Sequence, residues 1–392
     1  MRRALYTGDH QQYRETVREF IAREVAPYYL GWERDRLIDP EVFRAAAAHG
    51  IYALAVPEEY GGSGETDYRY RMVVNEETAR AGATSFNMTL GLQDDLVLAY
   101  LLDLTTPEQK KRWLTPFARG ELLGALAMTE PGAGSDLQGI RTAAHRDGPG
   151  PDADWLLTGQ KTFITSATSA DFVIVAARTD PAAGSRGFSL LVVERGMPGL
   201  RRGRKLEKVG LHGQDTGELY FDNVAVPAEN LIGTEGHGMA HLMSHLPRER
   251  LGIIASAYTT AREVYAATVR YCFERTAFDR AIGDFQHSRF VLAEMGTELD
   301  VAEAFVDRCV LASNAGELTP VDAAKGKWYL SELQKRVADQ CLQLHGGYGY
   351  MLEYPVARAF VDGRVQTIYG GSTEIMKEII GRDIAQRARA GG

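Results

Sequence analysis

Cysteine is scarce in this sequence. The 392 residues contain three, Cys272, Cys309 and Cys341, which lie far apart along the chain. No Cys-x-x-Cys pair occurs, so the sequence offers neither a typical zinc site nor a disulfide framework. Free thiols of this kind fit a reducing compartment, and we expect the protein to be cytoplasmic.

Long apolar runs and an excess of positive charge are also missing. No apolar run reaches the length that a membrane-spanning helix needs. Arg2 and Arg3 are not followed by the apolar stretch of a secretory signal, and an acidic residue appears by Asp9. The formal net charge of −8 argues against nucleic acid as the main partner, because phosphate binding needs a basic face. We therefore expect no membrane span and no nucleic-acid partner.

The Gly-x-Gly-x-x-Gly fingerprint of nicotinamide-type sites is absent, but another Gly-rich turn spans residues 128–136. Pro131 ends any helix that precedes it. Gly132 and Gly134 permit left-handed torsions or close approach of the backbone to a ligand. Ser135 then offers a short polar side chain, and such a turn can direct N–H groups at a phosphate. Many Gly-rich turns bind nothing, so the rest of the chain must decide what this one holds.

Hydrophobic periodicity divides the chain into three parts. Residues 1–124 have apolar positions at helical spacing, and residues 125–238 contain short β-branched and aromatic runs separated by turns. Residues 239–392 return to helical spacing in longer segments, with apolar residues alternately three and four apart, as in Leu292 to Cys309. The sequence predicts a mainly α protein with a middle all-β domain and a C-terminal helical bundle.

Two local patterns give sharper structural predictions. Thr106, followed by Pro107 and Gln109, has the composition of a capped helix start with a capping box. Trp155 to Gly159 and Lys161 to Thr165 have the composition of two short strands, and we expect them to form a hairpin.

Five motifs, taken in this order and at these spacings, make the chain resemble the acyl-CoA dehydrogenases over nearly its whole length. They are residues 127–136, 161–165, 275–279, 343–350 and 368–375. The resemblance implies an N-terminal helical domain, a β-barrel-like middle domain and a C-terminal four-helix bundle. It is closest to the long-chain type and implies a homotetramer, a dimer of dimers.

The resemblance also implies FAD, held between the β domain and the C-terminal bundle. The cofactor contacts it implies are Met128, Thr129, Gly134, Ser135, Phe163, Ile164, Thr165, Arg275, Phe278, Gln286, Gln343, Gly346, Gly347, Ser372 and Glu374. Arg275 and Gln286 would meet the diphosphate, and residues 343–347 would come from a neighbouring subunit. Phe163 stands where many members have tryptophan and can also stack on the flavin. The implied substrate contacts are Ser135, Arg250 and Gly370.

The reaction that the resemblance implies needs a base for the α proton and flavin N5 as acceptor of the β hydride. Much of the family has the base directly after Ile-Tyr, where this chain has Gly370. The long-chain and isovaleryl types have it in a Glu-Arg-Leu context, which Glu249 matches. A glutamate between two arginines is otherwise usually a solvated helix residue. Glu374 is the rival base, and Glu130 is more typical of a structural role.

We therefore expect an FAD-dependent dehydrogenase that makes a trans-2-enoyl thioester from a saturated acyl-CoA or acyl-carrier-protein thioester. Electron-transfer flavoprotein is the expected electron acceptor. A flavin oxidase or monooxygenase on the same fold is the second hypothesis, and a non-enzymatic helical scaffold is the third.

Two further clusters carry weaker signals. His237, His241 and His245 are four residues apart, and we interpret them as a polar face near the acyl-site entrance rather than a metal site, so no metal is expected. Four basic residues, Arg201, Arg202, Arg204 and Lys205, are typical of a solvated turn. A phosphate of a nucleotide or an acidic carrier protein is the alternative ligand for that cluster.

Overall fold

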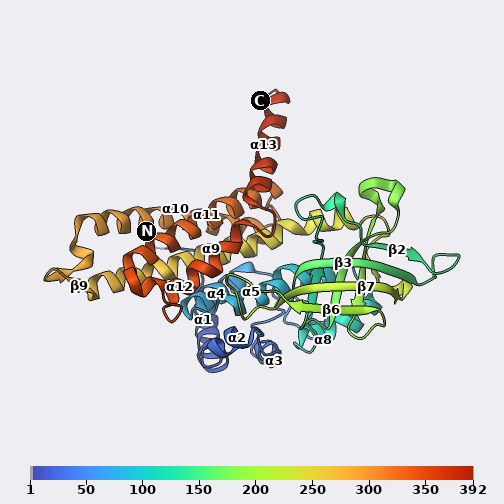
Figure 1. Ribbon diagram of the computed structural model, residues 1–392, viewed down its shortest axis with the longest axis horizontal. Helices are drawn as coiled ribbons and strands as arrows, with labels where there is room; N and C mark the ends of the chain where they lie inside the picture. Colours follow the sequence, from blue (N-terminus) through green and yellow to red (C-terminus); the bar gives the residue numbers. More distant parts are fainter. Residues whose placement is uncertain (1–2, 392) are drawn as a thin grey trace.

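The computed structural model of the protein describes residues 3–391. In Figure 1, the bundle of long helices lies on one side of the molecule and the β-sheet part on the other, with most of the N-terminal helices below and between them. This arrangement confirms the predicted order of helical, β and helical parts. None of the helices in the described part of the chain combines the length and apolar character that crossing a bilayer requires.

The N-terminal part is built from short helices around an aromatic-rich core. They are α1 (Gly8–Phe20), α2 (Tyr29–Asp35), α3 (Glu41–Ala48), α4 (Tyr68–Arg80), α5 (Thr84–Gly91), α6 (Leu98–Leu104), α7 (Pro107–Gln109) and α8 (Thr115–Ala118), with π-helical segments at Ile21–Val25, Leu92–Val97 and Lys110–Leu114. The predicted capping box at Thr106 is confirmed. Its hydroxyl accepts from the Gln109 backbone N–H at 3.2 Å, and the Gln109 side chain accepts from the Thr106 N–H at 2.8 Å.

The middle part is one eight-stranded sheet in the order β6-β7-β3-β2-β4-β5-β8, with β1 parallel to β4. The strands are β1 (Gly124–Ala127), β2 (Ala143–Arg146), β3 (Trp155–Thr165), β4 (Phe172–Arg178), β5 (Phe188–Glu194), β6 (Leu200–Lys205), β7 (Thr216–Val226) and β8 (Leu231–Ile232). The predicted hairpin at Gly159 is wrong, because β3 is one strand that pairs along its length with β7. Gly159 crosses the middle of it at φ 152°, where a Cβ would come within 2.5 Å of the Thr142 hydroxyl.

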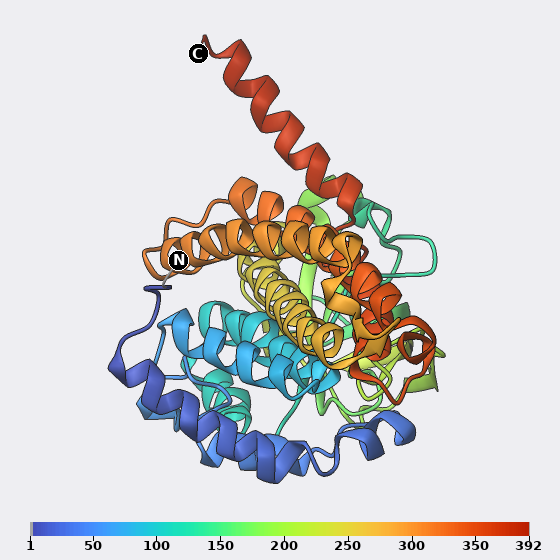
Figure 2. The ribbon, with the colours of Figure 1, turned by 90° about the vertical axis from the view of Figure 1, so that its left-hand side faces the viewer.

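The C-terminal part consists of α9 (Gly238–Glu274), α10 (Gln286–Asn314), α11 (Pro320–His345), α12 (Pro355–Gly363) and α13 (Thr373–Arg389), with a two-stranded turn of β9 (Thr276–Ala277) and β10 (Arg280–Ala281). The apolar faces of α9, α10 and α11 form a second core with α4. Because α9 passes from the sheet to the far end of the bundle, it connects all three parts. In Figure 2, α13 projects out of the body of the protein.

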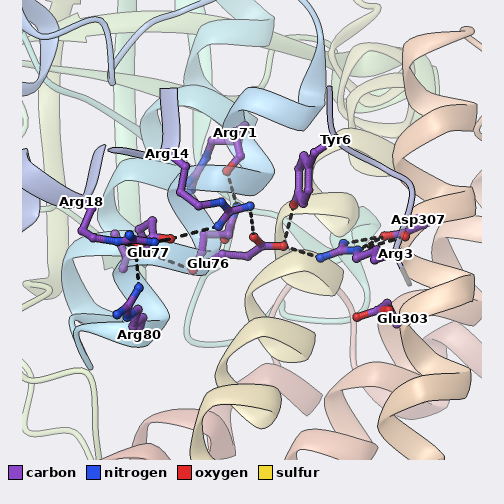
Figure 3. A network of polar contacts seen from close by, with 12 residues as sticks. Arg3, Tyr6, Arg14, Arg18, Arg71, Glu76, Glu77, Arg80, Glu303 and Asp307 are labelled. Carbon is purple, nitrogen blue, oxygen red and sulfur yellow. Dashed lines mark hydrogen bonds and ion pairs between the residues drawn. The ribbon is translucent and has the colours of Figure 1, made fainter. Parts of the chain in front are cut away.

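A network of ion pairs fastens the N-terminal segment to both helical parts (Figure 3). Arg3 pairs with Glu76 of α4 at 2.5 Å and with Asp307 of α10 at 2.5 Å. Arg14 of α1 pairs with Glu76 and Glu77 at 2.6 and 3.0 Å. Through Arg3, these contacts join α4 to α10, and through Arg14 they join α1 to α4.

Candidate active site

The Gly-rich turn after β1 is organised by one buried carboxylate. Glu130 accepts hydrogen bonds from the backbone N–H groups of Arg141 and Thr142 at 2.7 and 2.9 Å, and from the Lys161 ammonium at 2.9 Å. Lys161 also donates to the Met128 carbonyl at 2.9 Å, so β3 holds the start of the turn. Burial lowers the pKa of Lys161 to about 8, although Glu130 opposes the shift. Glu130 therefore has the structural role that the sequence predicted, and its partner Lys161 was missed.

The glycines of this turn differ in part from the expectation. Of the two possibilities that the sequence left open for Gly132 and Gly134, left-handed torsions do not occur, because neither glycine has a positive φ. A Cβ at either position would meet no described atom within 4 Å. What these glycines and the exposed Ser135 provide is an open approach to the backbone.

Phe163 is strained and exposed at the end of β3. Its φ is 58°, at a register shift between Lys161 and Ile164, and its ring is 68% exposed. An aromatic residue in the left-handed region costs free energy that functional sites often retain. Ile164 points the other way and is 3% exposed in the core of the sheet, so only its backbone can face a ligand. Thr165 is half-buried on the same side of β3 as Phe163.

Glu249 lies against Gly370, the position at which the resemblance described above would otherwise place the base. A Cβ on Gly370 would lie 3.4 Å from the Glu249 Oε1 and 2.5 Å from the Cδ1 of Ile253, one turn further along α9. The Oε2 of Glu249 is buried and has no hydrogen-bond partner among the described residues. Burial raises the pKa of this carboxyl, while the charges of Arg250 and Lys327 oppose the shift.

Two buried cations hold the glycine pair that faces Glu249. Lys327, 0% exposed in the middle of α11, donates to the Gly371 carbonyl at 2.6 Å. Arg250 donates from its Nε to the Gly370 carbonyl at 3.4 Å. Burial lowers the pKa of Lys327 to about 8, Arg250 adds to that shift, and Glu249 opposes it. Sequence reasoning missed Lys327, and its one signal was a lysine on the otherwise apolar face of a long helix.

The rival base, Glu374, is placed differently. It is exposed in the first turn of α13, where the helix N-terminal backbone and Ser372 lower its pKa. Ser372 caps that helix by accepting from the Ile375 N–H at 3.5 Å. Ser372 and Glu374 thus follow directly on the Gly370–Gly371 pair, but Glu374 is exposed whereas the Glu249 carboxyl is buried.

The remaining predicted cofactor residues gather at the opposite end of the bundle. Arg275, Gln343, Gly346 and Gly347 line an open pocket of about 460 Å³, with Tyr348 beside the Arg275 guanidinium. Phe278, 89% exposed, and Gln286, exposed at the start of α10, belong to the same end.

Within a single chain, the predicted cofactor residues near Phe163 lie far from those near Arg275. Arg275 and Glu249 are roughly 39 Å apart along the axis of α9 at a helical rise of about 1.5 Å per residue. Figure 1 places β9, next to Arg275, at the end of the bundle furthest from β3, which carries Phe163. The structure therefore brings the residues together in two groups rather than one.

The three histidines at the start of α9 differ in burial. His245 is buried, its Nε2 lies 3.0 Å from the Asp103 carboxylate, and its ring stacks on Tyr100 with centroids 4.5 Å apart. Burial opposes the charge of His245, but the hydrogen bond to Asp103 raises its pKa. His241 accepts from the Thr234 N–H, and its ring centroid lies 6.4 Å from that of His237, so the histidines follow one another along α9 while only His245 is buried. Within residues 3–391, no His, Cys, Asp and Glu side chains gather in a way that could hold a metal ion.

The basic cluster forms strand β6, not the solvated turn that was expected. Arg202 is half-buried and donates to the carbonyls of Thr168 and Ala170 at 2.7 and 2.6 Å. The Arg201 guanidinium lies 5.6 Å from the ring centroid of Tyr220. Arg201 and Arg202 therefore both make contacts within the β-sheet part.

The exposed groups at the two ends suit the two halves of FAD. Phe163 presents an aromatic face beside an open Gly-rich turn, which suits a flavin ring. The Arg275 guanidinium and the Gln343 amide are donors that suit a diphosphate, while the Gly346 N–H already donates to the Gln343 carbonyl at the end of α11. A Cβ at Gly346 or Gly347 would meet no described atom within 4 Å, so a ligand can approach the backbone there.

Comparison with known proteins agrees with this architecture. Three family models match in succession: acyl-CoA dehydrogenase N-terminal domain over residues 7–121, middle domain over 125–224 and C-terminal domain over 236–385. The mitochondrial long-chain specific acyl-CoA dehydrogenase of Sus scrofa is 42% identical over 384 residues, which cover 97% of this chain and 88% of that protein.

Two solved structures show the same fold. The acyl-CoA dehydrogenase from Geobacillus kaustophilus is 44% identical, with a TM-score of 0.93 over 97% of this chain and 98% of that one. A chain in the structure of the electron transferring flavoprotein of Acidaminococcus fermentans is 33% identical, with a TM-score of 0.91 over 98% and 99%. The chain thus belongs to the acyl-CoA dehydrogenase family, FAD-binding oxidoreductases that dehydrogenate acyl-CoA thioesters.

Proposed function

We propose that this protein removes the α proton of a saturated acyl-CoA with Glu249 and releases the trans-2-enoyl thioester. The observation that carries the proposal is the position of the Glu249 carboxyl against Gly370, with one oxygen buried and unpartnered. A carboxyl that burial keeps weakly acidic is a stronger base when it ionises. Its partner-free oxygen can accept a proton without first breaking a hydrogen bond.

Two residues near Glu249 hold the backbone that faces it. Arg250 and Lys327 hold the carbonyls of Gly370 and Gly371, so the backbone opposite the base stays fixed. Both residues in this glycine pair have a positive φ, and a Cβ would come within 2.5 Å of Ile253 at Gly370 and of Met376 at Gly371, so only glycine fits at either position. The positive charges of Arg250 and Lys327 also limit how far burial raises the pKa of Glu249.

FAD, when bound, supplies the acceptor for the β hydride. Met128, Thr129, Gly134, Ser135, Phe163, Ile164, Thr165, Ser372 and Glu374 are proposed to hold its flavin half, Ile164 through its backbone alone. Arg275, Phe278, Gln286, Gln343, Gly346 and Gly347 are proposed to hold the diphosphate half, from a neighbouring subunit of a homotetramer. Ser135, Arg250 and Gly370 are the proposed substrate contacts.

For the electrons we propose an electron-transfer flavoprotein as acceptor, with the Acidaminococcus fermentans structure as support. The names of the relatives favour coenzyme A as carrier over an acyl carrier protein, and a dehydrogenase over an oxidase or monooxygenase. Domain boundaries near residues 124 and 238, and the cytoplasm as compartment, remain predictions.

The variant Glu249→Gln tests the proposal. It keeps the shape of the side chain but cannot take a proton, so we expect FAD to stay bound while turnover falls by several orders of magnitude. The measurement is anaerobic bleaching of the flavin by saturated acyl-CoA, followed by steady-state turnover with an artificial electron acceptor.

Glu298→Gln is the matched control, because Glu298 is an exposed glutamate of α10 that pairs with Arg336. It should leave turnover unchanged. Near-normal turnover in Glu249→Gln would show that another group is the base. Rapid peroxide formation by the wild-type protein under air would instead favour the oxidase hypothesis.

A further inference from the structure

A buried polar cluster lies beside the proposed base and has no part in the reaction described above. We define the Arg71–Asp95 cluster as Tyr68 and Arg71 of α4, Asp94 and Asp95 of the π-helical segment Leu92–Val97, and Arg248 of α9. Arg71 is 5% exposed and Asp95 is 3% exposed. Charged side chains buried to this degree are costly unless their hydrogen-bonding groups find partners.

The cluster leaves several of these groups unused. The two terminal nitrogens of Arg71 donate to the side-chain oxygen and the backbone carbonyl of Asn87, at 3.0 and 3.2 Å. Its Nε lies 3.3 Å from an oxygen of Asp95 without hydrogen-bond geometry. Buried atoms with no hydrogen-bond partner among the described residues are Asp94 Oδ2, both oxygens of Asp95, Arg71 Nε, Arg248 Nε and the Tyr68 hydroxyl. Donors and acceptors are thus available side by side.

Two glycines make room for the cluster next to Glu249. A Cβ on Gly252 would lie 2.7 Å from Asp95 Oδ2, and a Cβ on Gly91 would lie 3.3 Å from the same oxygen. Gly252 follows Glu249 by three residues, so both face the same side of α9, with a rise of roughly 4.5 Å between them. The Asp95 carboxylate therefore sits one helical turn from the proposed base.

The charges of the cluster define what it can bind. Two arginines face two carboxyls, which leaves little net charge for a ligand ion to balance. Burial raises the pKa of Asp94 to about 7, although Arg71 opposes the shift. The unpartnered donors of the cluster are the Nε–H groups of Arg71 and Arg248 and the Tyr68 hydroxyl, and the unpartnered acceptors include both oxygens of Asp95. A neutral group that both donates and accepts hydrogen bonds matches this set better than a carboxylate or an ammonium.

We propose that the Arg71–Asp95 cluster recognises a hydroxyl group on the acyl chain, so that the preferred substrates are hydroxylated acyl-CoA thioesters. The inference rests on the proposed function, because it specifies the acyl chain of the thioester that Glu249 is proposed to deprotonate. An unsubstituted alkyl chain would cover the unused donors and acceptors without replacing their hydrogen bonds, which sites of this kind penalise strongly.

The test compares matched substrates on the FAD-loaded protein. Straight-chain saturated acyl-CoAs of increasing length are assayed beside their counterparts with a terminal hydroxyl. At the length that reaches the cluster, the hydroxylated thioester should have a kcat/KM at least about tenfold higher, because a hydrogen bond to a charged partner is gained. Plain chains that are equal or better at every length would overturn the inference.

Terminal carboxylate and ammonium series form two further arms, and a preference for either over the hydroxyl would also overturn it. If the hydroxylated and plain thioesters both fail to reduce the flavin, the proposed function itself fails. Reduction by plain chains alone contradicts only the present inference.

A double variant, Arg71→Met with Asp95→Leu, replaces the buried pair by apolar side chains, a change that folded proteins often tolerate. It should reverse the preference toward plain chains. The matched control, Arg262→Met with Asp300→Leu, removes an exposed pair between α9 and α10 at 2.9 Å and should leave the preference as in the wild type. If the buried double variant does not fold, the substrate series on the wild-type protein decides.

Discussion

At the scale of single residues, the environment of Glu249 makes the activity depend on pH. Burial raises the pKa of this carboxyl, and the positive charge of Lys327 opposes the shift. Because the base acts as a carboxylate, kcat/KM should increase as the pH rises through this raised pKa. The variant Lys327→Met removes an opposing charge, so its rising limb should lie at higher pH.

The pH profile of kcat/KM, recorded for wild type and variant, checks this prediction. Lys325→Met is the control, because Lys325 is on the same helix but is half-exposed and pairs with Asp322. A rising limb at the same pH in Lys327→Met and wild type would contradict the assigned coupling of Lys327 and Glu249.

The same carboxyl should cost stability when it ionises. Its folded pKa lies above its unfolded value, so the stability that its protonated form contributes is complete below the unfolded pKa and is lost as the pH rises through the folded pKa. Glu249→Gln stays neutral throughout. Above the folded pKa we expect the variant to be more stable than the wild type by about 1.4 kcal/mol for each unit by which the folded pKa exceeds the unfolded one.

Urea unfolding of the two proteins, at one pH below about 4 and at one well above the folded pKa, measures this difference. The free energies should agree at the lower pH and diverge at the higher. A wild type that is the more stable protein at high pH would mean that the ionised carboxylate is well solvated or paired.

At the scale of elements, β3 combines two departures from a regular strand. Gly159 lets it pass close to β2, and the register shift near its end turns Phe163 outward in a left-handed conformation. The sequence reasoning interpreted the glycine as the end of a strand, because a glycine between two β-branched runs is typical of a turn. Only the pairing with β7 on both sides of Gly159 decides that the strand continues.

Replacing Phe163 by glycine should separate stability from function in this element. Glycine adopts a positive φ without strain, so the FAD-free variant should gain about 1 kcal/mol in free energy of unfolding. The same change removes the exposed ring that we propose to stack on the flavin, so FAD affinity should fall. Thermal unfolding of the FAD-free protein and a fluorescence titration with FAD provide the two readouts.

Asn223→Gly serves as its control, since Asn223 also has a positive φ, 47°, and lies in β7 next to Thr158. It should leave FAD affinity unchanged. An unaltered FAD affinity in Phe163→Gly would remove this residue from the proposed cofactor site.

At the scale of the whole molecule, α9 keeps the two groups of proposed cofactor residues apart. The strand β3, which carries Phe163, lies on the opposite side of the molecule from β9, which follows Arg275 (Figure 1). Large apolar side chains are exposed around Arg275, among them Phe278 and Tyr350, as expected for a surface that a second copy covers. A site that needs both groups must therefore draw them from two subunits, which is why we propose a homo-oligomer.

Subunit mixing tests this arrangement. Arg275→Ala should weaken FAD binding and Glu249→Gln should stop turnover, so each protein alone is nearly inactive at low FAD. When the two are dissociated, mixed in equal amounts and reassembled, about a quarter of the shared sites should contain both wild-type residues. Turnover should reappear in that proportion. No recovery in mixed oligomers, verified by mass measurement, would mean that each site uses residues of one subunit only.

The sequence by itself determined the features that depend on short stretches of chain. Helical and strand periodicity divided it into three parts, the capping box at Thr106 followed from adjacent residues, and the five motifs pointed to the family and to Glu249. These signals survive without a structure because hydrogen-bond patterns and side-chain spacing within one element repeat over a few residues.

The tertiary structure decided what depends on distant segments meeting. It placed Glu249 against Gly370, buried Lys327 behind that loop and kept β3 continuous through Gly159. It also gathered Arg71, Asp95 and Gly252 beside the base, which no local pattern indicated. Burial and desolvation arise only when elements pack, so the pKa shifts and unused hydrogen-bonding groups of this protein could not be predicted from local sequence.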